Sequence, residues 1–225
     1  MLIMKREGKE TAREYAFRVV KHNIISLELT PGSMLSENEL AAEIGISRTP
    51  VREALIELSK LKVVEILPQK GSRIALIDSR LVEEASYVRL VLEKAIVEMD
   101  CDVAKEEDFL ALDENLRLQE FYLQYPSKDK QLQLDNDFHK LLFEICRKEF
   151  TYDLLSGMMT HFDRVRRLSL LVIKDTKTIS DHRALVEAIR KRDKELGKEI
   201  ITKHLSRYKV DEQELKSRYP EYFKK

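Results

Sequence analysis

The sequence contains no tryptophan, few glycines and prolines (6 and 5 of 225 residues), and no net charge at pH 7. Scarce glycine and proline, with a charged fraction of 36%, favour a mostly helical soluble protein. The zero net charge gives none of the overall basicity that is typical of nucleic-acid-binding chains, so any such function must rest on local charge. The length fits one large domain or two small ones.

Cysteine is also rare, and long apolar runs are missing. The two cysteines, Cys101 and Cys146, lie in helical patterns without CxxC spacing, which predicts small buried thiols in a reducing compartment. No apolar run approaches the length of a membrane span, and the first residues lack the apolar core of a signal peptide. We therefore expect a cytoplasmic protein with no membrane partner.

One stretch in the first third of the chain carries the most specific pattern. Ser36 and Glu39 have the spacing of a capping box, which predicts the start of a short helix. Gly45 then allows a tight turn into a second helix that begins at Ser47 or Thr49. The second helix has apolar residues at i, i+3, i+4 and i+7, namely Val51, Ala54, Leu55 and Leu58. This spacing predicts a helix-turn-helix with one buried stripe.

A hairpin follows the two helices. The segment 63–67 is β-branched and apolar, Lys70 and Gly71 lie in a turn, and the segment 72–77 runs back. A hairpin with a basic tip directly after a helix-turn-helix predicts a wing. Positive charge exceeds negative charge from residue 44 to residue 77, where the cations are Arg48, Arg52, Lys60, Lys62, Lys70 and Arg73 and the anions are Glu53, Glu57 and Glu65. This local surplus would meet the phosphates of DNA.

The motifs in this stretch, taken in order, resemble the winged helix of the GntR family of bacterial transcription regulators. They are Pro-Gly, Leu-Ser-Glu-x-Glu-Leu, Ser-Arg-Thr-Pro-Val-Arg-Glu-Ala-Leu and a Lys-Gly wing. The resemblance implies seven DNA-binding residues: Asn38, Ser47, Arg48, Thr49, Arg52, Lys70 and Gly71. Arg48 and Arg52 would read base edges in the major groove, and the wing tip would enter the minor groove. Asn38 departs from the arginine that the family frequently has at that position.

The rest of the chain shows helical periodicity with no convincing strand. A first helix is expected over 10–27, and later helices over 79–103, 106–125, 129–147, 150–173, 178–192 and 194–209, with breaks at Pro126 and around 174–180. The polar end of the chain is expected to add one more turn. The predicted fold is mainly α, with a winged helix-turn-helix of three helices and a β-hairpin, followed by an all-α antiparallel helical bundle. The predicted domains are 1–78 for DNA binding and 79–225 for effector binding and dimerisation.

Three histidines and an aspartate in the bundle have the pattern of a metal site. Asp135 and His139 are four residues apart on one helix face, and His182 and His204 lie in later helices. Together they would form a site of three nitrogens and one oxygen for a borderline divalent metal. Spacing alone leaves the commoner alternative open, in which these histidines are hydrogen-bonded structural residues.

A second resemblance concerns residues from about 80 to 210. Four segments are similar to the helical effector domain, called FCD, of the FadR-type GntR subfamily: Arg89-x-x-x-Glu93, Leu134-Asp135-x-x-Phe138-His139-x-x-Leu142, Asp181-His182-x-x-Leu185-x-x-Ala188-Ile189 and Lys203-His204-Leu205. The resemblance implies that Asp135, His139, His182 and His204 bind a divalent metal. Zinc is the first expectation, with nickel and manganese as alternatives. Asp181 stands where the family often has glutamate.

Arginines supply candidates for binding a carboxylate in a bidentate fork. They are Arg89 and one of Arg164 or Arg166. We therefore expect a ligand-responsive homodimer that binds a palindromic operator and responds to a small organic acid. Two alternatives remain: a metalloenzyme, since such ligands also serve non-haem iron and hydrolytic zinc centres, and a purely structural metal.

Overall fold

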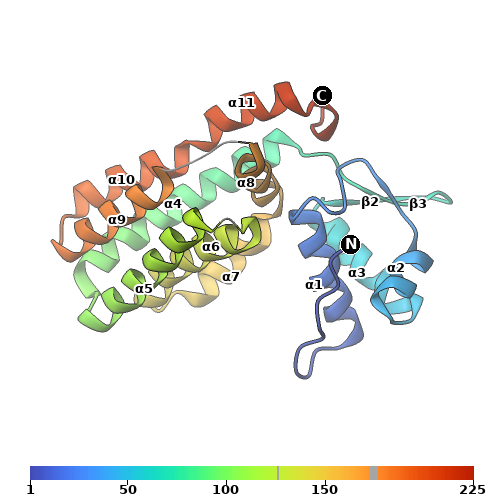
Figure 1. Cartoon of the computed structure of the whole chain (residues 1–225), viewed down its shortest axis with the longest axis horizontal. Coiled ribbons are helices and arrows are strands. Elements are labelled where there is room, and N and C mark those ends of the chain that lie inside the picture. The colour runs from blue at the N-terminus through green and yellow to red at the C-terminus, as the bar shows by residue number, and fades with distance from the viewer. Residues whose placement is uncertain (126, 173–176) are drawn as a thin grey trace. The chain divides into compact units, whose positions relative to one another are not determined.

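The computed structural model describes residues 1–125, 127–172 and 177–225 (Figure 1). The chain begins with α1 (Ala12–Ile25), β1 (Met34–Leu35), α2 (Glu37–Ile44), α3 (Arg48–Lys60), β2 (Val64–Leu67) and β3 (Gly71–Ile74). It continues with α4 (Ser79–Val103), α5 (Glu106–Gln124), α6 (Lys128–Ile145), α7 (Glu149–Met158), α8 (Thr160–Val172), α9 (Lys177–Arg190), α10 (Lys194–Ser206), α11 (Tyr208–Arg218) and the 3-10 helix η1 (Pro220–Tyr222). The mainly helical fold and its wing hairpin are as predicted. The predicted break at Pro126 and the first part of the break predicted around 174–180 lie outside the described residues, whereas residues 177–180 are already part of α9.

The chain divides into two compact units. Unit 1 contains Met1–Val82, Thr160–Leu168 and Leu215–Lys225, and unit 2 contains Glu83–Met159 and Ser169–Glu214. The N-terminal part of unit 1 is therefore joined by the first half of α8 and by the end of the chain. The predicted division between residues 78 and 79 did not anticipate these two additions, and it stays a prediction.

The helix-turn-helix forms for local reasons. The Ser36 hydroxyl accepts a hydrogen bond from the Glu39 N–H at 3.3 Å, which is one of the two bonds of the expected capping box. Gly45 ends α2 in the left-handed conformation, with φ +77°. Ser47 is the N-cap of α3. The predicted stripe of α3 is confirmed, since Val51, Ala54, Leu55 and Leu58 are all fully buried.

The wing belongs to a three-stranded antiparallel sheet with the order β1-β3-β2. β1 was not predicted, because two residues are too short to show an alternating pattern. Glu65 pairs with Arg73 across β2 and β3, and their side chains form an ion pair of 2.5 Å. Gly71 has φ +96°, and a Cβ there would lie 3.3 Å from the Leu35 carbonyl oxygen. The close approach of β1 therefore adds a second reason for glycine at this position.

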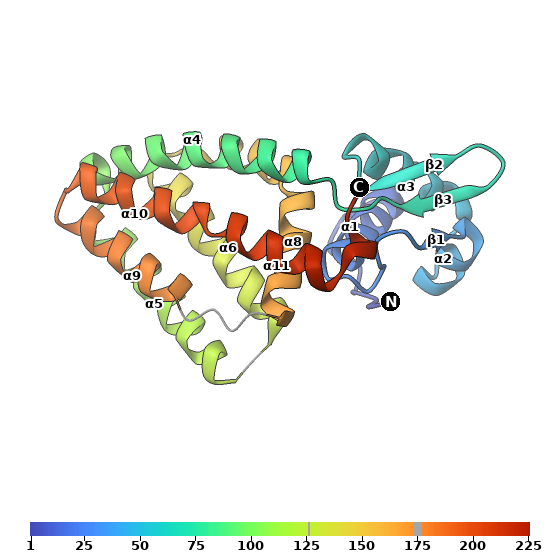
Figure 2. The same cartoon turned by 90° about the horizontal axis from the view of Figure 1, so that it is seen from above.

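Unit 2 is helical, and its core lies between α4, α5, α6, α9 and α10 (Figure 2). α5 packs on α6, and α9 packs on α10. In the described part of the chain, no helix combines the length and the apolar character needed to cross a bilayer.

Two expectations about helix boundaries were wrong. The helix predicted over 150–173 is two helices, α7 and α8, with Met159 between them. Gly157 in the last turn of α7 weakens helical continuity, and Thr160 begins the next helix. The polar end of the chain, expected to add one turn, forms the 11-residue helix α11.

Candidate metal centre and nucleic-acid interface

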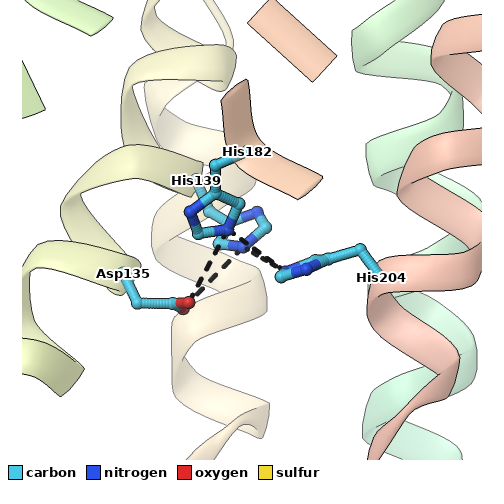
Figure 3. A group of neighbouring side chains, drawn as sticks. All are labelled: Asp135, His139, His182 and His204. Atoms are coloured by element: carbon cyan, nitrogen blue, oxygen red, sulfur yellow. Dashed lines mark hydrogen bonds and ion pairs between the residues drawn. The ribbon is translucent and has the colours of Figure 1, made fainter. Parts of the chain in front are cut away.

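Four predicted ligands converge inside unit 2 (Figure 3). Asp135 and His139 come from α6, His182 from α9 and His204 from α10. One ligand atom of each residue lies within 4.8 Å of the others. His204 Nε2 is 3.3 Å from both His139 Nε2 and His182 Nε2. The i, i+4 spacing on α6 and the packing of α9 on α10 thus place three imidazoles and a carboxylate around one point.

The hydrogen bonds made by the Nδ1 atoms of two of these rings determine which ring nitrogen carries the hydrogen. His139 Nδ1 lies 2.7 Å from Glu93 Oε2, and His182 Nδ1 lies 3.0 Å from Gln119 Oε1. Both partners are acceptors, so each Nδ1 carries the hydrogen and each Nε2 presents a lone pair to the centre. His204 Nδ1 faces Asp181 Oδ2 at the longer distance of 3.6 Å. Because Nε2 of His139 and of His182 are both unprotonated, the single Nε2 of His204 can donate to at most one of them, whereas a cation among the three rings can bind all of the lone pairs.

The acceptors are themselves held in place by neighbouring side chains. Arg89 Nε donates to Glu93 Oε1 at 2.6 Å, and both side chains are buried. Gln119 Nε2 donates to Asn115 Oδ1 at 2.6 Å, which turns the Gln119 oxygen toward His182. The Phe138 ring stacks on His182, with ring centroids 4.0 Å apart. These contacts orient the ligands before any ion binds.

Electrostatics keep two of the imidazoles neutral. Burial, followed by the nearby Arg89 charge, lowers the pKa of His139 to about 4. Burial and then the neighbouring His204 lower the pKa of His182 well below its usual value. Burial raises the pKa of Glu93, but Arg89 and His139 outweigh it and bring that pKa to about 2. Neutral imidazoles that present unprotonated nitrogens beside the Asp135 carboxylate match the donor set of a divalent cation, so the residues present fit such an ion.

The three predicted effector arginines are divided between the two units. Arg89 is 4% exposed and reaches the centre only through Glu93. Arg164 and Arg166 belong to unit 1, whereas the four ligands belong to unit 2. Arg166 pairs with Asp163 at 3.1 Å. Arg164 donates to backbone carbonyl oxygens of unit 1, and its expected role in holding a carboxylate effector stays a prediction.

The sequence patterns did not indicate the residues that support the predicted ligands. Glu93 was noted only as a partner of Arg89, and Asn115 and Gln119 were not noted at all. A signal for the latter pair was present, because two amides four residues apart on the apolar face of α5 require polar partners when buried. The partners could not be named, since His182 lies 63 residues away from Gln119.

The predicted nucleic-acid interface is accessible throughout. All seven predicted DNA-binding residues are exposed: Asn38, Ser47, Arg48, Thr49, Arg52, Lys70 and Gly71. Arg48 pairs with Glu37 of α2, with 2.6 Å between Nε and Oε2. Glu37 lies before residue 44 and pairs with Arg48, so the local positive surplus is one charge smaller than the count over residues 44–77. Glu65, the partner of Arg73, was already part of that count.

Comparison with known proteins finds two family matches along the chain. Residues 13–74 match the profile of the bacterial regulatory proteins of the gntR family, and residues 84–207 match the FCD domain. The chain belongs to the GntR family. It is a DNA-binding transcription regulator with an FCD domain, and not an enzyme, so the metalloenzyme alternative falls away.

This regulator matches other transcription regulators over most of their length. The HTH-type transcriptional repressor RspR of Escherichia coli K12 is 26% identical over 215 residues, which cover 95% of this chain and 94% of the relative. The gluconate operon transcriptional repressor of Bacillus subtilis is 27% identical, over 84% of this chain and 78% of the relative. The solved structure of E. coli McbR/YncC has a TM-score of 0.78 at 18% identity, over 93% of this chain and 99% of that one, which supports the fold.

Proposed function

We propose that this GntR-family regulator binds a divalent metal in its FCD domain and changes its operator affinity when a small organic acid binds there. One observation carries the proposal: three imidazole Nε2 atoms and the Asp135 carboxylate meet at one buried point, with two Nδ1 atoms held by acceptors. Structural histidines in a core donate to acceptors with at least one nitrogen each and need no common centre. Here the unprotonated Nε2 atoms of His139 and His182 both face His204 Nε2 at 3.3 Å.

The proposed ligands are Asp135, His139, His182 and His204, with zinc as the first expectation and nickel and manganese as alternatives. A bound divalent ion would supply a positive charge able to attract a carboxylate. The test is elemental analysis of the purified protein and of His182→Ala. We expect close to one equivalent of one of these metals in the parent protein and a large loss in the variant. Equal metal contents would end the metal proposal.

The acid would bind beside the metal centre, with Arg89, which belongs to the same unit, as the candidate arginine. Support for an acid comes from the relative named as repressor of a gluconate operon, which makes gluconate the first compound to test. A thermal-shift screen of sugar acids and dicarboxylates, followed by operator binding with and without each hit, tests the coupling. An acid that raises the melting temperature without changing operator affinity would contradict it.

At the DNA, Arg48 and Arg52 would read bases, Ser47 and Thr49 would bind phosphates, and Lys70 and Gly71 would place the wing in the minor groove. We further propose a homodimer on a palindromic operator. Exposed apolar side chains on α4 and α7 support a subunit interface, among them Tyr87, Val91, Phe150 and Leu154. Sedimentation of the full chain tests the dimer.

A purely structural metal is the remaining alternative. Chelation separates the two roles. Loss of the acid response with a modest fall in melting temperature supports an effector anchor, while a large fall in melting temperature together with lost operator binding supports a structural ion.

A further inference from the structure

The first half of α8 makes hydrogen bonds to the wing, which precedes it by 89 residues. Arg164 has no exposed surface, and its Nη1 donates to the Ala75 carbonyl oxygen at 2.6 Å. Its Nη2 lies 3.3 Å from the Leu76 oxygen and 2.8 Å from His161 Nδ1. A guanidinium can only donate, so His161 Nδ1 bears a lone pair and its Nε2–H donates to the Lys62 oxygen at 3.0 Å.

These acceptors flank the base of the wing. Lys62 comes two residues before β2, and Ala75 directly follows β3. The Ala75 N–H also donates to the Val63 oxygen at 3.0 Å, which joins the two strands at the same level. The Arg164–His161 pair therefore forms hydrogen bonds with residues just before and just after the hairpin. These residues lie at the base of the wing, away from the Lys70–Gly71 tip.

Stability alone does not account for an arginine at this place. Within the described residues, the donors of Arg164 meet carbonyl oxygens and an imidazole, and no carboxylate pairs with it. A buried charge without an opposite charge usually costs more than an apolar residue of similar volume. A fork of donors does, however, fix several backbone oxygens relative to one another, which an apolar side chain cannot do.

The C-terminal residues of the chain form hydrogen bonds with the segment that directly follows the wing. Ile77 N–H donates to the Tyr222 oxygen at 2.8 Å, and Lys224 N–H donates to the Ile77 oxygen at 2.9 Å. Phe223 between them is 4% exposed, and Lys224 Nζ lies 3.2 Å from Asp78 Oδ2. This terminal segment lies beyond both family matches, which end at residues 74 and 207. The exit of the wing is thus held from two sides.

We propose that Arg164 and His161 are positioning residues for operator binding, which fix the base of the wing so that its tip meets the DNA, and that the terminal segment Tyr222–Lys224 completes this support. The proposal rests on the proposed wing contact with DNA. It assigns a role in the DNA-binding unit to two chain segments that follow the winged-helix sequence.

A double-mutant cycle on the full chain tests the proposal. The probe is a duplex that the full-length protein selects from a random library, and the readout is fluorescence anisotropy. Arg164→Met should weaken binding about fivefold, and Lys70→Ala about threefold in the parent protein. In the Arg164→Met background the Lys70→Ala effect should nearly vanish, because a displaced tip no longer reaches the DNA. The Arg52→Ala effect should stay the same in both backgrounds.

Each other outcome has a distinct meaning. An unchanged Lys70→Ala effect in the Arg164→Met background overturns the positioning role while leaving the wing contact intact. A Lys70→Ala effect absent already in the parent protein overturns the proposed wing contact and this inference with it. Equal shrinkage of the Lys70→Ala and Arg52→Ala effects indicates general unfolding and also overturns it. Arg183→Met is the matched control, since Arg183 is exposed and pairs with Glu120.

Amide hydrogen exchange gives a second readout that does not require DNA. Phe223→Ala should raise the exchange rate of the Ile77 amide by about tenfold or more, and Arg164→Met should do the same for the Ala75 amide. Amides of the α3 core, such as Leu55, should keep their rates in both variants. Unchanged exchange at Ile77 and Ala75 would remove both parts of the support.

Discussion

Glu93 accepts from His139 Nδ1 at 2.7 Å while its other oxygen accepts from Arg89 Nε at 2.6 Å, so one buried carboxylate links an arginine to a candidate metal ligand. Both contacts favour the ionised carboxylate, and the ionised carboxylate favours hydrogen on Nδ1. The orientation of His139 therefore depends on a residue that does not touch the centre.

Replacing this carboxylate should weaken metal binding without removing a ligand. For Glu93→Gln we expect metal affinity to fall about 10- to 100-fold, because the amide carries no charge to hold the Nδ1–H form. Competition with a chromophoric chelator measures the change. Glu98→Gln on the same helix is the control, since Glu98 pairs with Lys198 at the surface at 3.8 Å. Equal affinities in the two variants would contradict the assigned role.

His161 should make the protein sensitive to acid. Burial, and then the adjacent Arg164 charge, lowers its pKa from 6.5 to about 3. Below pH 6.5 the unfolded chain takes up a proton that folded His161 does not, so stability is present above that pH and is lost as pH falls toward 3. At pH 4.5 we expect the parent to lose about 2–3 kcal/mol more than His161→Gln, relative to pH 7. Urea unfolding at the two pH values measures this, and parallel losses would refute it.

Arg52 and Lys70 should respond differently to DNA sequence and salt. Arg52→Ala should cost about 1–3 kcal/mol of specific binding and little of the binding to a scrambled duplex. Lys70→Ala should weaken binding to both duplexes and reduce the slope of log K against log salt by about one. Titrations at several salt concentrations separate these results. An unchanged sequence preference in Arg52→Ala would remove that residue from base readout.

The Glu37–Arg48 pair should restrict how Arg48 is used. Its N···O distance is 2.6 Å and the Arg48 side chain is 62% exposed, so the pair adds only about 0.2–1 kcal/mol to stability. Glu37→Gln frees the guanidinium, and we expect tighter binding to scrambled DNA with a smaller preference for the selected duplex. Glu39→Gln is the control, since Glu39 is the next acidic residue of α2 and is exposed. A preserved preference in Glu37→Gln would show that Arg48 does not need this partner.

The sequence alone was enough for the features that depend on neighbours along the chain. The Ser36 cap, the Gly45 turn and the α3 stripe involve residues a few positions apart, so their pattern is visible in the letters. The same holds for Asp135 and His139, which share a helix face because they are one turn apart. The resemblance to the family added His182 and His204 to the predicted ligands, and all four predicted ligands do converge.

Tertiary structure alone decided which residues support these sites. Glu93 meets His139 across 46 residues, and Arg164 meets Ala75 across 89 residues. Arg164 was predicted to bind an effector because a guanidinium can hold a carboxylate in a bidentate fork, yet it packs against the residue that follows the wing and belongs to unit 1. The physical reason is that a local pattern fixes the face of a helix on which a side chain lies, whereas the partner on that face is chosen by how distant segments pack.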